Sequence, residues 1–302
     1  MRILVLGAGG FLGGHTAGYL RTLPGVRVLG GGRAPSADLP ADLGTASVGE
    51  LTAALSELAV DAVVNCAGAV AGGAVCLAEV NARAPAALCE ALREAAPTAR
   101  LVHIGSAAEY GVAPEGAALT EASPACPLGP YGATKLAGSL AVAGAPLDAV
   151  VLRVFNPLGP GTPSTALPGR LAGQLRHAGR DGVVRVGDLS AYRDFVDVRD
   201  VARAAALAAT VRGTLPRIVN IAAGRAVRVR EVAWGLARVA GFRGSIEESA
   251  GVASARSAAV SWQQADISAA QRALGWRPRI ALADSLRDLW DSSGPGAPEA
   301  RH

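Results

Sequence analysis

Tyr131 and Lys135 are the pair of residues whose types and spacing most directly suggest catalysis. They stand four positions apart at the start of a segment with helical periodicity, so their side chains share one face of the helix. A lysine ammonium within a few ångströms of a phenol favours the phenolate and lowers the pKa of the phenol toward neutrality. We therefore expect Tyr131 to exchange a proton with a substrate, assisted by Lys135.

Ser106 is the third candidate catalytic residue. It follows the apolar run 101–105, which is typical of a strand buried in a parallel sheet and in which His103 is expected to pack in the core. Ligands of open α/β sheets bind beyond the carboxyl ends of the strands, so a hydroxyl there can hydrogen-bond a substrate oxygen. A Tyr-x-x-x-Lys pattern alone is a weak signal, but a serine placed in this way before it strengthens the interpretation.

A dinucleotide-binding turn is indicated at the start of the chain. The buried run Arg2–Leu6 leads into glycines at positions 7, 10 and 13, and a helical pattern follows to about position 21. The first glycine would allow a sharp turn, the second the close approach of a pyrophosphate, and the third close packing of helix and strand. Free N–H groups and the helix dipole would then face the phosphates. The predicted phosphate-binding residues are Gly7, Gly10, Phe11, Leu12 and Gly13.

Arg33 indicates which cofactor the turn would bind. It follows a second predicted strand, at the place where NAD-specific units carry a carboxylate that binds the ribose hydroxyls. The residues here are Gly30, Gly31, Gly32 and Arg33, with no carboxylate to repel a 2′-phosphate and a guanidinium able to hold one. NADP(H) is therefore favoured, with NAD(H) as the alternative; Arg33 could also be a solvated loop residue.

Further cofactor contacts are expected after other strands. A short third segment ends at positions 42 and 43, and the apolar run 61–65 ends in small residues that leave room for a cofactor across the sheet. One long helix is predicted over 74–96, kinked or broken at Pro85, with an asparagine near its middle. The expected contacts are Asp42, Leu43, Cys66, Ala67, Gly68, Asn81 and Phe155, together with Tyr131 and Lys135.

Composition narrows the class of protein. The chain has 302 residues, 50% of them apolar, and a formal net charge of +4 without a run of five like charges. This argues against a nucleic-acid surface and is compatible with small anionic ligands such as diphosphates. The four cysteines lack metal-ligand or disulfide spacing, so no metal site is predicted. With no signal-peptide pattern and no long apolar run, we expect a cytoplasmic protein without a membrane partner.

These motifs together resemble the extended short-chain dehydrogenases/reductases of the NAD-dependent epimerase/dehydratase family, which act mainly on nucleotide sugars. The resemblance extends over nearly the whole chain. Residues 152–161 are similar to the family's LRxxNxxGPG segment, whose asparagine contacts the sugar. Residues 193–201 are similar to the RDFxDVRDV segment of the GDP-4-keto-6-deoxymannose reductase branch, which implies that Arg193 faces the diphosphate while Asp194 and Asp197 fix the fold. The substrate contacts implied are Ser106, Ala107, Asn156, Arg193 and Arg256.

The predicted fold is α/β, a Rossmann-type doubly wound parallel sheet with a smaller C-terminal α/β substrate lobe. Residues 1–156 and 191–221 are assigned to the NADP-binding domain, because strand signals at 194–198 and 217–221 flank a helix. Residues 157–190 and 222–293 are assigned to the substrate lobe and 294–302 to a tail. A short strand is expected at 260–262, in the lobe.

The resemblance also implies a C₂ homodimer, since family members commonly pair through two long helices. The helix over 74–96 and the helix that begins near Tyr131 carry small apolar residues suited to close approach. These residues are Ala84, Ala86, Ala87, Ala91, Ala137, Ala141 and Ala143.

One departure from the family limits the reaction. Dehydratases carry an acidic residue or pair where this chain has Ala107 and Ala108, so it lacks the acid and base for eliminating water. Glu109 is displaced by one position and, on a strand-like segment, would face the other way.

The leading function is NADPH-dependent reduction of a keto group on a nucleotide-activated deoxysugar. Tyr131 would protonate the alkoxide, and Ser106 would orient the carbonyl. Lys135 would lower the pKa of the Tyr131 phenol and hold the nicotinamide ribose. The alternative is a 4-epimerase that retains its nicotinamide. A non-catalytic NADP(H)-binding regulatory protein is disfavoured because both the tyrosine and the lysine are present.

Overall fold

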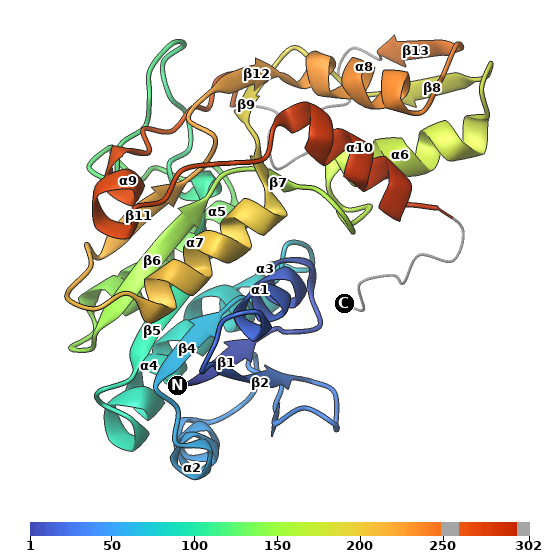
Figure 1. Cartoon of the computed structure of the whole chain (residues 1–302). Coiled ribbons are helices and arrows are strands. Elements are labelled where there is room, and N and C mark those ends of the chain that lie inside the picture. The colour runs from blue at the N-terminus through green and yellow to red at the C-terminus, as the bar shows by residue number, and fades with distance from the viewer. Residues whose placement is uncertain (249–259, 295–302) are drawn as a thin grey trace.

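Seven parallel strands form the central sheet, in the order β11-β6-β5-β4-β1-β2-β3 (Figure 1). The structure is a computed structural model that describes residues 1–248 and 260–294. The chain builds outward from β1 in one direction and then returns through β4 in the other, which confirms the predicted doubly wound Rossmann-type fold. The strands are β1 (Arg2–Leu6), β2 (Arg27–Gly32), β3 (Leu39–Pro40), β4 (Ala62–Asn65), β5 (Arg100–Ser106), β6 (Ala149–Val154) and β11 (Ile218–Ile221).

Helices cover both faces of this sheet. Successive strand residues point to opposite faces, so Ile3 belongs to one hydrophobic core and Leu4 to the other. The face of Ile3 packs against α1 (Phe11–Arg21) and α7 (Val198–Thr210). The face of Leu4 packs against α2 (Val48–Leu58), α4 (Ala84–Ala95) and α5 (Pro130–Gly144). Among the described residues, no helix is both long and apolar enough to cross a membrane.

The predicted helix over 74–96 is helical throughout but not uniform. It consists of α3 (Ala74–Ala78), a π-helical turn (Glu79–Arg83) and α4, so the irregularity precedes Pro85 instead of lying at it. Proline has no N–H to donate to the carbonyl four residues earlier. The wider turn absorbs this loss, because the N–H of Ala84 donates to the oxygen of Glu79, five residues back.

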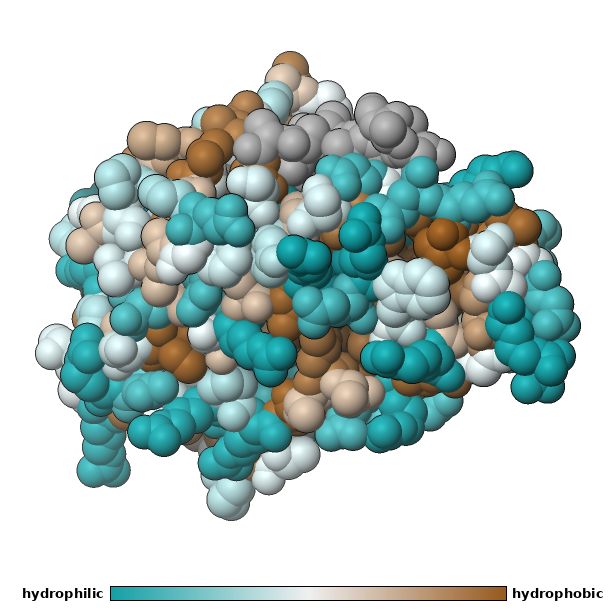
Figure 2. Space-filling model, turned by 90° about the horizontal axis from the view of Figure 1, so that it is seen from above, coloured by the Kyte–Doolittle hydropathy of each residue, from teal (hydrophilic) through white to brown (hydrophobic). Residues whose placement is uncertain are grey.

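A third hydrophobic core lies in the C-terminal half of the chain, to the upper right in Figure 1. Its leucines and valines come from β7 (Pro157–Leu158), α6 (Leu167–Ala178), β8 (Val183–Val186), α8 (Val229–Val239) and α10 (Leu282–Ser292). Strand β8 pairs in parallel with β13 (Ser245–Glu248). Seen from above, hydrophilic side chains are scattered over the surface with apolar ones between them (Figure 2). The proposed domain boundaries stay a prediction.

Two strand predictions differ from the structure. The region 194–198 holds two short strands outside the large sheet: β9 (Tyr192–Asp194) pairs with β12 (Ala226–Arg228), and β10 (Val196–Asp197) pairs with β7. Of the segment 191–221, β11 pairs in the large sheet and α7 packs in its core, where Val196 of β10 also lies. Residues 260–262 form no strand. Strand β9 pairs with β12, and its Tyr192 N–H donates to Ser261 O in this segment.

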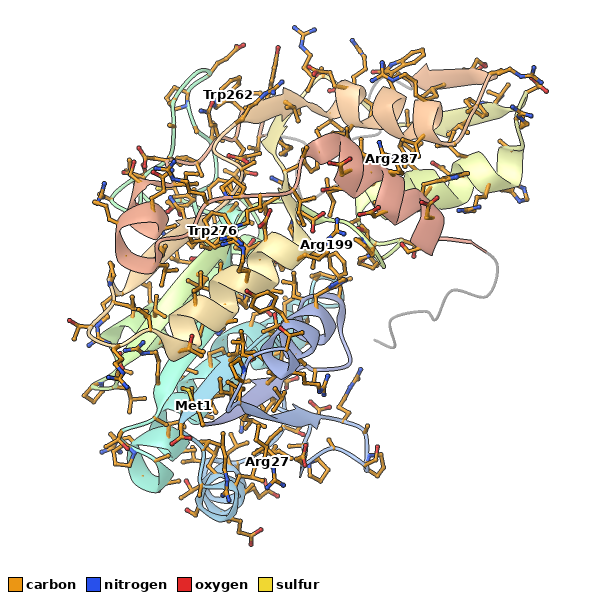
Figure 3. All side chains as sticks on the ribbon, in the orientation of Figure 1. Met1, Arg27, Arg199, Trp262, Trp276 and Arg287 are labelled. Atoms are coloured by element: carbon orange, nitrogen blue, oxygen red, sulfur yellow. The ribbon has the colours of Figure 1, made fainter. Side chains whose placement is uncertain are left out.

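Part of the C-terminal segment returns to the core of the large sheet. Helix α9 (Ser268–Leu274) and Trp276 pack in the core that contains Ile3, although both lie within the predicted substrate lobe. The Trp276 indole donates to the backbone oxygen of Asp200 at 2.9 Å, and Figure 3 shows the ring beside α7. The C-terminal segment thus contacts both the core that contains Ile3 and the core of the C-terminal half.

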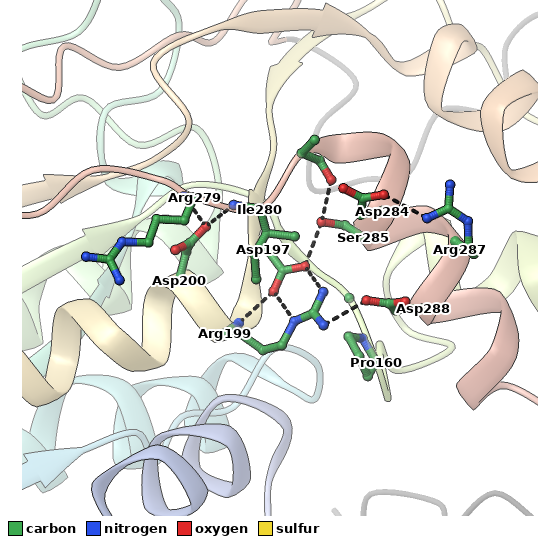
Figure 4. A network of polar contacts seen from close by, with 12 residues as sticks. Pro160, Asp197, Arg199, Asp200, Arg279, Ile280, Asp284, Ser285, Arg287 and Asp288 are labelled. Carbon is green, nitrogen blue, oxygen red and sulfur yellow. Dashed lines mark hydrogen bonds and ion pairs between the residues drawn. The ribbon is translucent and has the colours of Figure 1, made fainter. Parts of the chain in front are cut away.

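Asp197 joins α7 to α10, as Figure 4 shows. Its carboxylate accepts hydrogen bonds from the N–H of Arg199 at 2.8 Å, which caps the helix, and from the hydroxyl of Ser285 at 2.6 Å. The Arg199 guanidinium binds the same carboxylate and also Asp288 on α10, at 2.8 and 2.7 Å. Asp197 therefore fixes the fold, as predicted.

Asp200 fixes the segment that precedes α10. Its carboxylate accepts the backbone N–H groups of Arg279 and Ile280, at 2.8 and 2.9 Å, and pairs with Arg203 at 2.8 Å. Both side chains of this pair are almost fully buried. A buried carboxylate is stable in such a place only when its hydrogen bonds are made, and here they are.

Replacing Asp200 by alanine tests this role. Asp200→Ala leaves Arg203 charged and buried without its partner and two N–H groups without their acceptor, so the free energy of unfolding should fall by about 3 kcal/mol or more. Asp284→Ala is the matched control, since Asp284 makes an exposed pair with Arg287 and should cost less than about 0.5 kcal/mol. Equal losses in urea-induced unfolding would contradict this account.

Candidate active site

Many of the predicted site residues lie along one edge of the sheet. All seven strands are parallel, so the segments that follow β1, β2, β4, β5 and β6 emerge at the same edge. These segments contain, in turn, the glycine turn, Arg33, Cys66 to Gly68, Ser106, and Phe155 with Asn156.

The glycine turn after β1 packs directly on the end of β4. Gly7 has a φ of 73°, and a Cβ there would lie 2.9 Å from the backbone nitrogen of Ala67. A Cβ on Gly13 would collide with the oxygen of Gly7, so these two positions require glycine for backbone contact. Gly10 donates its N–H to Gly7 O at 2.9 Å and caps α1. The roles predicted for the first and third glycines, sharp turn and close packing, are confirmed.

Phe11 opens α1, where the sequence places it. Its ring contacts that of His15 edge to face, with centroids 5.7 Å apart. His15 Nε2 lies 2.9 Å from the carbonyl oxygen of Pro160, in the loop after β7. The first turns of α1 are thus joined to the C-terminal half, by a contact that no sequence pattern indicated. Leu12 is partly buried against the core that contains Ile3.

Lys135, Asn81 and Gly68 meet at the end of β4. The Lys135 ammonium donates to the backbone oxygen of Ile104 at 2.6 Å, and burial lowers its pKa to about 8. A Cβ added to Gly68 would lie 3.3 Å from Asn81 Oδ1 and 3.9 Å from Lys135 Nζ. The small residue expected at this strand end therefore borders the lysine. Burial also raises the pKa of the Cys66 thiol to about 12, so that thiol is neutral.

Asn81 holds the loop after β4 against α5. Its amide oxygen accepts from Ala69 N at 2.9 Å, and its amide nitrogen donates to Ala69 O at 2.8 Å and to the hydroxyl of Thr134 at 3.3 Å. Thr134 stands between Tyr131 and Lys135 on α5. Asn81 thus positions the helix that carries Tyr131 and Lys135, the predicted catalytic pair.

Ser106 ends β5 and begins a 3₁₀ turn, Ala107–Glu109, instead of the strand-like segment that we expected. The Ser106 hydroxyl accepts the N–H of Ala108 at 3.2 Å and so caps this turn. The start of α5 packs on the same turn, since a Cβ on Gly132 would lie 2.5 Å from Ala108 O. Tyr131, the neighbour of Gly132, is thereby placed beside the Ser106 turn.

Glu109 points into the protein, which corrects the orientation expected from a strand. Its side chain is fully buried and pairs with Arg153 on β6 at 2.7 Å. It also accepts the backbone N–H of Ser106 and the hydroxyl of Ser139, at 2.7 and 2.8 Å. The turn lets the side chain fold back under Ser106, and the sequence alone gave no sign of this pairing.

A carboxylate, that of Asp38, lies against the end of β2. Arg33 is exposed just beyond the strand, as expected. Asp38, five residues later, folds back so that its Oδ2 accepts the N–H of Gly30 on β2 at 2.8 Å. The prediction that no acidic group stands here was wrong, because it considered only the residues that directly follow the strand.

The third strand is shorter than predicted. Strand β3 ends at Pro40, so Asp42 and Leu43 lie in the turn that follows it. Asp42 is exposed and accepts the N–H of Gly44 at 3.0 Å, whereas Leu43 is buried in the core beneath α2. Their contact with a cofactor stays a prediction.

The residues after β6 are held by the C-terminal segment. Phe155 is fully buried, with its ring centroid 6.1 Å from that of Tyr110. Asn156 donates to Asp194 O and to Gln263 Oε1, both at 2.9 Å. Gln263 in turn donates to Ala107 O at 3.3 Å. A buried glutamine thus joins two predicted substrate contacts.

Arg193 is almost fully buried and donates to backbone oxygens of Tyr192 and Val260, both at 2.7 Å. Burial lowers the pKa of its guanidinium. These bonds join β9 to the segment near position 260, and contact with a diphosphate stays a prediction. Arg256 lies outside the described residues.

Asp194, the other carboxylate expected to fix the fold, does so. It is fully buried and accepts backbone N–H groups of Ala223 at 2.8 Å and of Gly224 and Ala265 at 3.1 Å. It therefore ties β9 to the turn after β11 and to the segment before α9.

The NAD dependent epimerase/dehydratase family model matches residues 3–222. The dTDP-6-deoxy-L-talose 4-dehydrogenase (NAD(P)(+)) of Kitasatospora kifunensis is 36% identical over 96% of this chain and 94% of its own.

Solved structures share the whole architecture. MoeE5 in complex with UDP-glucuronic acid and NAD is 30% identical, with a TM-score of 0.81 over 96% of this chain and 98% of its own. The RMD of Pseudomonas aeruginosa complexed with NADPH is 24% identical, with a TM-score of 0.81 over 96% and 97%; at that identity the likeness shows the fold alone. Because the family model spans most of the sequence and the curated relative nearly all of it, the chain belongs to the NAD-dependent epimerase/dehydratase family.

Proposed function

We propose that this protein is an NAD(P)H-dependent ketoreductase that reduces the 4-keto group of a nucleotide-activated deoxysugar. The observation that carries this proposal is the placement of Lys135 and Tyr131 on α5 against the turn that begins at Ser106. The 36% identical relative is named as a 4-dehydrogenase of a dTDP-6-deoxysugar, whose reaction is the reverse of such a reduction.

The edge of the sheet fits a nicotinamide dinucleotide. The glycine turn leaves the first N–H groups of α1 at the carboxyl end of β1, which suits a pyrophosphate. Gly68 leaves space beside Lys135 and Asn81 that a Cβ would fill. The reduced cofactor, when bound, supplies the hydride.

The three catalytic residues then have separate tasks. Tyr131 gives its phenolic proton to the oxygen of the carbonyl as the alkoxide develops. Lys135 is an ammonium below a pH of about 8 and stabilises the resulting phenolate. The Ser106 hydroxyl, fixed by the N–H of Ala108, still has a proton with which to hydrogen-bond the carbonyl.

The sugar would reach this site already oxidised at the carbon to be reduced. Ala107 and Ala108 supply no carboxylate for eliminating water, so the keto group must come from an earlier reaction. Asn156 and Arg193 are the proposed sugar and diphosphate contacts.

We expect one NADPH to be oxidised for each dTDP-4-keto-6-deoxyhexose that is added. The oxidation is measured as the fall in absorbance at 340 nm. An epimerase that retains its nicotinamide, or a non-catalytic binding protein, would consume no added NADPH. That outcome would exclude the ketoreductase.

Substitution of the three residues tests their tasks. Tyr131→Phe removes only a hydroxyl, so NADPH affinity should survive while kcat falls about 10²-fold to 10⁴-fold. Lys135→Met should reduce both kcat and NADPH affinity, and Ser106→Ala should cost less kcat than either. If Tyr131→Phe leaves kcat within about threefold of the parent, Tyr131 is not the proton donor.

For the cofactor, we propose that NADP(H) is preferred and NAD(H) accepted. Arg33 offers a guanidinium for a 2′-phosphate, whereas Asp38 places a negative charge against β2 that suits ribose hydroxyls and repels a phosphate. The two side chains act in opposite directions, which supports a preference without strict selection.

Dissociation constants of NADPH and NADH, measured by fluorescence titration, test this balance. NADPH should bind more tightly to the parent, and Arg33→Asp should reverse the order. Asp38→Asn keeps an acceptor for Gly30 N but removes the charge, so it should increase the preference for NADPH. Equal constants in the parent, or no change in either variant, would contradict the assignment.

We also propose the C₂ homodimer, with a corrected interface. Ala84, Ala87 and Ala91 are buried in the protomer's own core and cannot contact a second copy. The face formed by α3 and α5 instead exposes apolar side chains, with Val75 71% and Leu140 58% exposed. Ala86, Ala137, Ala141 and Ala143 remain partly or fully exposed.

Light scattering at micromolar concentration should give the mass of a dimer. Leu140→Glu would place charges across the two-fold axis and should give a monomer. Val183→Glu on β8, where the valine is 49% exposed, is the control that should remain dimeric. A monomeric parent would contradict the proposal.

A further inference from the structure

Glu109 is the most completely enclosed charged group beside the proposed catalytic residues. Its side chain has no exposed surface. One carboxylate oxygen, Oε1, accepts the backbone N–H of Ser106 at 2.7 Å and the hydroxyl of Ser139 at 2.8 Å. The other, Oε2, pairs with Arg153 at 2.7 Å. Every bond is made to a different element of the large domain.

These bonds connect the two elements that carry the catalytic residues. Ser139 stands four positions after Lys135 and eight after Tyr131 on α5, so all three side chains lie on one face of the helix. Ser106 ends β5. A single oxygen of Glu109 therefore joins the catalytic face of α5 to the strand end that holds the third catalytic residue.

The carboxylate is fixed in this position by its surroundings. The Arg153 guanidinium lies 4.5 Å from the centroid of the Tyr110 ring, and the Tyr110 hydroxyl donates to Asn220 at 2.7 Å. A Cβ on Gly105 would lie 2.7 Å from Glu109 Oε1, so the backbone of β5 passes directly against the carboxylate. Glu109 thus has little freedom to let α5 shift.

Glu109 also affects Lys135 through its charge. Burial lowers the pKa of Lys135, and the negative charge of Glu109 opposes that shift. Besides Tyr131 on the same helix face, the titratable groups near the lysine include Cys66 from the end of β4, whose thiol is neutral, and His103 on β5. Burial holds the pKa of His103 well below its usual value, and its ring packs in the core against Asn65 as expected. Arg153 is the remaining charge that faces Glu109.

We propose that Glu109 is a positioning residue, which sets the register of α5 against the end of β5 and so the geometry of Tyr131, Lys135 and Ser106. The inference rests on the proposed function, because it assigns no contact with substrate to Glu109. Dehydratases of the family use carboxylates near this position as acids. Glu109 instead couples two structural elements inside the catalytic site.

Ser139→Ala tests the coupling without leaving a charge unpaired. It removes the bond between Glu109 and α5, and kcat should fall about tenfold, because small displacements of catalytic groups are costly. Ser285→Ala is the matched control, since Ser285 is also a buried serine bonded to a carboxylate, that of Asp197, and lies far along the chain on α10. It should leave kcat within about twofold. Equal kcat values for the two variants would overturn the proposal.

Glu109→Gln tests the charge by a measurement that a purely structural role would not move. Lys135 should lose its proton at lower pH, so the alkaline decline of kcat/KM and the alkaline weakening of NADPH binding should both begin at lower pH. Ser139→Ala keeps the charge and should leave both profiles in place. Unmoved profiles in Glu109→Gln would overturn the proposal, and if that variant does not fold, the Ser139→Ala result decides.

The outcomes separate this inference from the proposed function. If Tyr131→Phe abolishes turnover while Ser139→Ala does not reduce it, the function stands and the coupling is wrong. If Tyr131→Phe is harmless, the proposed function fails, and the positioning of Tyr131 fails with it. The NADPH titration at varied pH needs no sugar substrate, so the effect of Glu109 on Lys135 is measured in either case.

Discussion

Parallel pairing of the seven strands is the constraint on which the rest of the structure depends. Because β1 pairs in parallel with both β2 and β4, every strand delivers its following segment to one edge of the sheet. The glycine turn, the small residues after β4 and the Ser106 turn meet there although they are far apart in sequence. The strands themselves are stable in this arrangement because helices bury both of their faces.

Buried carboxylates fix the irregular segments that parallel strands leave between them. Asp194 and Asp200 accept N–H groups from segments that lack regular structure. Asp197 caps the start of α7, and Glu109 accepts the N–H of Ser106 at the end of β5. Removing a carboxylate from water is costly unless several donors replace the solvent. Each of these residues has several such donors. This accounts for their buried positions at the ends of elements, whereas acidic residues usually lie on the surface.

The electrostatics at this edge of the sheet is set by side chains that face one another across elements. Lys135 is buried enough to lower its pKa to about 8 yet retains a nearby carboxylate, so its ammonium persists at neutral pH. Arg33 and Asp38 similarly bring opposite charges to the end of β2. The effective charge at each place is therefore a property of the folded chain and not of one motif.

Local sequence determined the elements whose pattern is complete within a short segment. The buried strand and glycine turn before α1 and the helical spacing of Tyr131 and Lys135 could be predicted because neighbouring residues alone decide them. Only the tertiary structure decided the contacts between distant segments. Asp38 returns to β2 from a loop, Gln263 reaches Ala107 and Asn156, and Glu109 pairs with Arg153 and Ser139. No periodic pattern in the sequence predicts such contacts. The partner of a side chain across the fold depends on how the elements pack, and not on the residues next to that side chain in sequence.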